Sequence, residues 1–145
     1  VISFVWAISS MLFLVIENEI IITQNIILHL ASRFLFVFAI TIPFDIRDLK
    51  HDIGKLKTIP LFFGEKKSKW LANFGLLICV IIAFLQQLQN NISFSNFIAL
   101  LLLYFLTLVL VIKSDKKNSE MYFSFWIESL SIFCYLFLVI MPLIV

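Results

Sequence analysis

Charged residues are scarce in this sequence. Asp, Glu, Lys and Arg make up 14% of its 145 residues, whereas typical globular chains carry about 25%. The formal net charge of +2 is too small to indicate nucleic-acid binding, and two cysteines are too few for a secreted disulfide scaffold. The sequence also lacks a Walker loop, a zinc-ligand pattern, a G-x-S-x-G elbow and a dinucleotide fingerprint.

Apolar residues dominate instead. They form 62% of the chain, and the mean hydropathy is +1.08, which excludes disorder and exceeds what a small soluble core can bury. A spanning helix needs roughly 20 apolar residues, and five segments reach or approach this length: 1–16, 26–44, 70–88, 96–112 and 122–143. These runs are continuous, whereas the strands of a membrane barrel alternate. We therefore expect an all-α, polytopic transmembrane helix bundle forming a single membrane domain over 1–145.

The basic residues are distributed unevenly among the connecting segments. Of eleven Lys and Arg, seven lie between the second and third spans, three between the fourth and fifth, and one, Arg33, within a span. The positive-inside rule then predicts that the loops 45–69 and 113–121 are cytoplasmic and that the C-terminus lies on the outer side. We expect a multi-pass protein of a bacterial-type inner membrane.

The beginning of the sequence differs from that of a secreted protein. There is no initiator Met, and no basic region precedes the first apolar run, so a signal peptide is not expected. We expect the chain to be part of a longer coding sequence.

One loop carries residues suited to catalysis. Asp45, Asp48 and Asp52 follow the second span at spacings of three and four, which place them on one helical face. Carboxylates at such short distances from one another raise one another's pKa unless a cation lies among them. Mg²⁺ is a suitable cation, because it commonly bridges carboxylates to substrate phosphates. The nearby basic residues are suited to an anionic phosphate group: Arg47, Lys50, Lys55 and Lys57. The alternative is a solvated helix end beside an ordinary basic loop.

The motif resembles a known family. The pattern Asp45-x-x-Asp48-x-x-x-Asp52, followed by Gly54, by Lys57-Thr58-Ile59-Pro60 and by Gly64, is similar to the second aspartate-rich motif of the UbiA superfamily of intramembrane prenyltransferases. Members have about nine helices, with this motif after the sixth. Two spans before the motif and three after it make the chain similar to helices five to nine, the C-terminal half. The family's first aspartate-rich motif is absent, so we expect the isolated chain to be inactive.

The resemblance implies a function. It implies transfer of an isoprenoid chain from a polyprenyl diphosphate to a small acceptor, such as an aromatic quinone precursor. It implies Asp48, Asp52 and Asp45 as catalytic Mg²⁺ ligands, and Lys57, Lys55 and Arg47 as contacts of the diphosphate. Mg²⁺ would neutralise charge that develops on the departing diphosphate. Beyond the lipid bilayer and these substrates we expect no obligate protein partner and no nucleic acid.

Two other interpretations remain open. Membrane phosphatidyltransferases also use Asp clusters and Mg²⁺, but their D-G-x-x-A-R…G-x-x-x-D-x-x-x-D pattern is missing. A non-catalytic scaffold or transporter segment could carry an acidic loop that merely binds cations.

Several residues within the spans need separate explanations. Ionisable groups there are costly and usually face the protein interior; His29 and Arg33 share a helical face, and an Arg33–Glu128 pair is conceivable. Phe38 and Phe44 are candidates for cation–π contact with an allylic cation. Cys79 and Cys134 are expected to be packing residues rather than a disulfide.

Overall fold

A computed structural model describes residues 5, 6, 8, 9, 16, 23–49 and 58–144 of the chain. In this part of the chain the structure is all-helical and contains no strand. Four helical segments are long and apolar enough to cross a membrane. They are α2 (Gln24–Asp48), α4 (Glu65–Leu88), α5 (Phe94–Lys113) and the segment Tyr122–Ile144, which consists of the π-helix η1 (Tyr122–Ile127) and α6 (Leu130–Ile144). Of the expected span 1–16, only residues 5, 6, 8, 9 and 16 are described.

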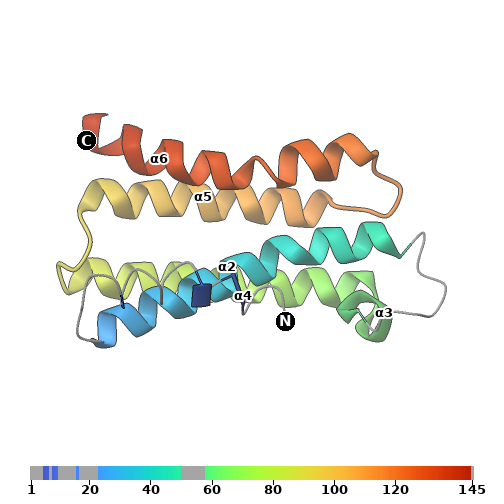
Figure 1. Ribbon diagram of the computed structural model, residues 1–145, viewed down its shortest axis with the longest axis horizontal. Helices are drawn as coiled ribbons and strands as arrows, with labels where there is room; N and C mark the ends of the chain where they lie inside the picture. The colour runs from blue at the N-terminus through green and yellow to red at the C-terminus, as the bar shows by residue number, and fades with distance from the viewer. Residues whose placement is uncertain (1–4, 7, 10–15, 17–22, 50–57, 145) are drawn as a thin grey trace.

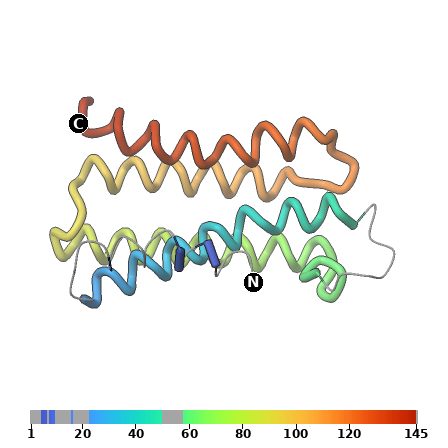
Figure 2. The backbone as a smooth tube through the Cα atoms, in the orientation of Figure 1, coloured from blue at the N-terminus to red at the C-terminus, as the bar shows by residue number. Residues whose placement is uncertain are grey.

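Successive long helices run in opposite directions (Figure 1). α2 packs against α4, α4 against α5, and α5 against α6, and the backbone trace in Figure 2 shows the same order. A short helix, α3 (Ile59–Phe63), packs against both α2 and α4. α2 also contacts α5 and η1.

The helices extend beyond the apolar segments seen in the sequence. α2 continues through Pro43 and includes Asp45 and Asp48, and α4 begins at Glu65, before its cluster of lysines. Hydropathy marks only the part of a helix in the hydrocarbon core, whereas charged residues continue the same helix at its boundary. The ion pair between Glu65 and Lys69, one turn apart at 2.8 Å, helps to form the first turn of α4.

Small side chains allow α2 and α4 to approach closely. The face of α4 toward α2 carries small residues at spacings of three and four, and Gly75 faces Leu35 of α2, whose atoms lie 3.8 and 3.9 Å from where a Cβ on Gly75 would be. The buried core on this side includes Ala39, Ile42, Ile46, Ala72, Leu76, Cys79 and Ala83. A second cluster joins α5 to the last segment and contains Leu103, Leu110, Phe123, Ile127 and Leu130.

The two ends of the bundle differ in chemistry. One end, which we name the charged end, is where α2 and α5 terminate and α4 and η1 begin, and it carries Lys66, Lys67, Lys69, Lys113, Lys116, Lys117 and Glu120 (Figure 1). The opposite, amide end contains the turn between α4 and α5. There the Asn91 side chain donates to Oδ1 of Asn25 at 2.9 Å, which ties this turn to the start of α2. Both basic segments of the described chain thus lie at one end.

Candidate functional site

The first half of the aspartate motif forms the last turn of α2. Asp45 and Asp48 are both half-buried, and their three-residue separation brings their Cβ atoms to about 5–6 Å in a helix. Carboxylates at a helix C-terminus also face the negative end of the helix dipole. Two such groups in one turn are electrostatically unfavourable unless cations compensate them, and this makes the position a candidate cation site.

Arg47 supplies part of that compensation. Its Nε donates to Oδ1 of Asp48 at 2.8 Å, and its guanidinium lies over the ring of Phe44, with Cζ 5.3 Å from the centroid. Glu120 and Glu128 are near enough to interact electrostatically with it. Arg47 is therefore held at the charged end by one carboxylate and one aromatic ring.

The remaining predicted site residues, Asp52, Lys55 and Lys57, lie outside the described residues. Within the described part of the chain no three His, Cys, Asp or Glu side chains gather into a metal-binding group. The structure therefore brings Asp45, Asp48 and Arg47 together on one turn and leaves the third carboxylate and both lysines as predictions.

The chain returns to this turn at Thr58. Thr58 precedes α3, which begins with Ile59-Pro60 and packs against α2 and α4. The Oγ1 atom of Thr58 is buried, and no hydrogen-bond partner for it occurs in the described part of the structure. Pro60 suits the first turn of a helix because its missing N–H would have no intrahelical partner there. The Thr-Ile-Pro segment of the motif thus lies against the helix that carries its aspartates.

A membrane-level groove begins beside the motif. It has a volume of about 620 Å³ and is lined by all four long segments and by Trp6. Phe44, the residue before Asp45, lines it at the charged end, whereas Ile92 and Asn96 line it near the amide end. From Phe44 to His29 on α2 the groove runs about 22 Å at 1.5 Å per residue. Most of the lining is apolar.

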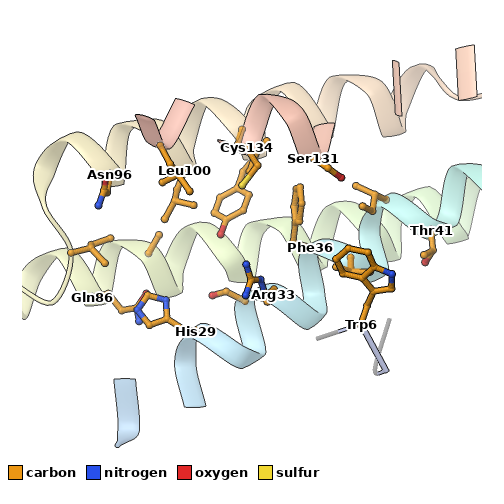
Figure 3. Close-up of a pocket in the computed structure, with 18 of the residues that line it drawn as sticks. Trp6, His29, Arg33, Phe36, Thr41, Gln86, Asn96, Leu100, Ser131 and Cys134 are labelled. Carbon is orange, nitrogen blue, oxygen red and sulfur yellow. The ribbon is translucent and has the colours of Figure 1, made fainter. Parts of the chain in front are cut away.

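The lining is not uniform along its length. Towards the amide end it includes a set of polar side chains from three helices: His29, Ser32, Arg33, Gln86, Asn96 and Tyr104. Figure 3 shows Arg33 projecting from α2 into the groove between His29 and Phe36. We name these six residues the polar belt.

The Arg33–Glu128 pair that the sequence allowed is absent. The ion pairs among the described residues are Arg47–Asp48 and Lys69–Glu65, and Glu128 is exposed near the charged end, where it interacts with Arg47 instead. Arg33 lies one to two turns deeper and interacts electrostatically with His29 and Cys134. Their different depths along antiparallel helices keep the two groups apart.

The structure also separates the two phenylalanine candidates. Phe44 lines the groove, whereas Phe38 stacks on Phe34 at 6.4 Å and packs against the α2–α4 core. Both cysteines are free; Cys79 is buried and Cys134 is half-buried. Cys79 donates to the Ser32 carbonyl at 3.4 Å.

Sequence reasoning missed four members of the polar belt. Ser32, Gln86, Asn96 and Tyr104 lie near the ends or in the middle of apolar runs, where single polar residues attract little notice. One signal in the sequence could have found Tyr104. It lies about 15 Å from the amide end of α5, and Arg33 lies about 14 Å from the amide end of α2, so the two residues are at similar depths. Recognising it required knowing that α2 and α5 face one another.

No family model, no curated protein and no solved structure matches this chain.

Proposed function

We propose that this chain is part of a UbiA-type membrane prenyltransferase, the C-terminal half with the second aspartate motif. The observation that carries the proposal is that Phe44, which lines the groove, is followed on α2 by Asp45 and, one turn on, by Asp48. A polyprenyl diphosphate has an apolar chain and an anionic head. A membrane-embedded apolar groove that ends at a cation site and an arginine suits both parts at once.

The described residues fit a magnesium ion. Asp45 and Asp48 offer hard oxygen donors from a single turn, and Mg²⁺ is usually held by only one or two carboxylates together with substrate phosphates and water. When bound, Mg²⁺ would offset the charge that gathers on the departing diphosphate. Asp52 is the proposed third ligand.

Arg47 is proposed to position the diphosphate. The guanidinium carries five N–H donors, and its contact with Asp48 uses Nε. The Phe44 ring beneath it restricts where the planar group can lie. Lys55 and Lys57 are proposed as further diphosphate contacts, and the acceptor is proposed to be a small, quinone-precursor-like ring.

A binding experiment on the chain itself tests whether it binds a prenyl diphosphate with Mg²⁺ at Asp48. Farnesyl diphosphate is titrated into the chain in lipid nanodiscs, with Mg²⁺ or with EDTA. We expect Mg²⁺-dependent binding that Asp48→Asn weakens at least tenfold, because one ligand and the Arg47 partner are lost together. Asp115→Asn is the matched control, since it makes the same change at the charged end in a residue that caps the Lys117 amide. Binding that is equal with EDTA, or that Asp48→Asn leaves unchanged, would contradict the proposal.

A test of the transfer reaction requires the complete enzyme. In the full-length protein, Asp48→Ala and Asp52→Ala should each largely abolish prenyl transfer. If both variants retain near wild-type transfer, the carboxylates are not the catalytic ligands. Mg²⁺ binding without prenyl-diphosphate binding would instead favour a cation-binding scaffold or transporter segment.

A further inference from the structure

The polar belt of the groove is not used by the proposed transfer reaction. It lies toward the amide end, and Arg33 is twelve residues from Asp45 on α2, about 18 Å along the axis. A single aromatic ring held at Arg33 would not reach the aspartates. The belt therefore needs an explanation of its own, which does not depend on the proposed function.

Gln86 provides the first observation that points to a ligand. Its residue is 1% exposed, it lines the groove, and its Nε2 has no hydrogen-bond partner in the described part of the structure. An unsatisfied buried donor costs about 1–3 kcal/mol, and such groups are rare unless something binds them. Figure 3 places Gln86 at the side of the groove where His29 lies.

Arg33 provides a second, independent observation. It carries a full positive charge within a span, and the ion pairs among the described residues do not include it. Intramembrane arginines generally pair with an anion or line a polar cavity. His29 and Cys134, which interact with Arg33 electrostatically, offer no carboxylate.

The chemistry of the belt selects an anion on an apolar body. The guanidinium of Arg33 and the amide Nε2 of Gln86 are both donors, so the complementary group is an acceptor. From Arg33 toward the charged end the same groove is lined by Phe36, Val37, Ile40, Leu103 and Phe44. A ligand with an oxyanion head at Arg33 would have its chain covered by these side chains.

We propose that the groove binds a long-chain carboxylate, with its head at Arg33 and Gln86 and its chain along the apolar wall. A planar carboxylate matches the fork of a guanidinium. At about 14 Å from the start of α2, a carboxylate is also easier to desolvate than a phosphate, because it carries one charge and can enter protonated. The chain of such a ligand occupies the space beside Phe44, so it excludes any isoprenoid tail from the same groove.

Trp6 allows the proposal to be tested by fluorescence, because it lines the groove. Trp70 and Trp126 are first replaced by Phe, which leaves Trp6 as the single reporter. The chain in nanodiscs is then titrated with 11-bromoundecanoic acid, whose bromine quenches tryptophan on contact. We expect saturable quenching that Arg33→Gln weakens at least tenfold, that Arg33→Lys partly restores, and that Gln86→Met weakens by a smaller factor. Lys113→Gln, which removes an exposed charge at the charged end, should leave it unchanged. Circular dichroism establishes that each variant keeps its helix content.

Three comparison ligands decide between the possible sources of the signal. The methyl ester of the same acid should fail to quench saturably; equal quenching by ester and acid means simple partitioning and overturns the proposal. An 11-bromoundecyl phosphate that binds more tightly than the acid overturns it in favour of a phosphate head. 2-Naphthoic acid should compete weakly; competition as strong as that of undecanoic acid shows that the apolar wall contributes nothing and also overturns it. A result that overturns the carboxylate proposal does not change the Mg²⁺-dependent binding expected for farnesyl diphosphate, so the two proposals are tested separately.

Discussion

Replacing Gly64 by alanine tests whether the joint between α3 and α4 depends on backbone conformation alone. Gly64 has φ 80° and ψ 159°, a region that is essentially restricted to glycine. A Cβ at this position would meet no atom within 4 Å. Steric crowding is thus absent, and the whole effect of the substitution must come from the backbone.

The surrounding hydrogen bonds prevent the joint from relaxing. The Gly64 amide donates to the Pro60 carbonyl at 3.0 Å, and its carbonyl accepts from the amide and the hydroxyl of Ser68 at 3.1 and 2.9 Å. We therefore expect Gly64→Ala to cost about 1–3 kcal/mol, which lowers the folded-to-unfolded ratio by about one to two powers of ten.

Gly75, in the interior of α4, is the matched control. It lies inside α4 with ordinary backbone geometry, and an added Cβ would make van der Waals contact with Leu35 at 3.8 Å. Gly75→Ala should therefore be neutral or stabilise by up to about 1 kcal/mol, because glycine within a helix is entropically unfavourable.

The assay is reversible unfolding of the chain in mixed micelles, followed by the helical circular dichroism signal. The expected order of stability is Gly75→Ala at or above wild type and Gly64→Ala below it. If Gly64→Ala is as stable as wild type, the strained conformation is not required. If Gly75→Ala is the less stable of the two, the contact with Leu35 has been misjudged.

Two further predictions concern the hairpin between α5 and α6 and the orientation of the bundle. The Tyr122 hydroxyl donates to the Leu110 carbonyl, so Tyr122→Phe should lower the unfolding free energy by about 0.5–1.5 kcal/mol; the same change at Tyr135, which is 68% exposed, serves as the control, and equal losses would mean that the hydrogen bond is not stabilising. Cysteines introduced at Lys67 and Lys116 should react with an impermeant thiol reagent from the same side of the membrane, and one at Asn91 from the other. Labelling of the first two from opposite sides would refute the arrangement in Figure 1.

The sequence predicted the approximate extent of the four described spans, because a helix that crosses a bilayer needs a long run of apolar residues. Hydropathy ended the second span at Phe44, whereas the spacing of Asp45 and Asp48 predicted a helical face, and α2 does continue through both residues. The sequence did not predict α3 or the π-helical turn η1, since both depend on packing between segments distant in the chain.

Part of the candidate site was also predictable from the sequence. Spacing alone was enough to group Asp45 with Asp48. The contact of Arg47 with Phe44 and the exclusion of Phe38 from the groove depend on helix rotation, which no linear pattern records. The burial of Gln86 depends on how α4 packs against its neighbouring helices.

The unequal chemistry of the two ends has a consequence for how the protein responds to bilayer thickness. Exposed lysines and Trp70, which is 79% exposed in the second turn of α4, anchor the charged end at the interface. The described residues of the amide end include no lysine or arginine and so offer no comparable anchor. α5, with 20 residues, spans about 30 Å, which is close to the hydrocarbon thickness of a bilayer. Hydrophobic mismatch should therefore be absorbed by the amide end, and in a thinner membrane the polar belt would lie nearer to water while the aspartates keep their depth.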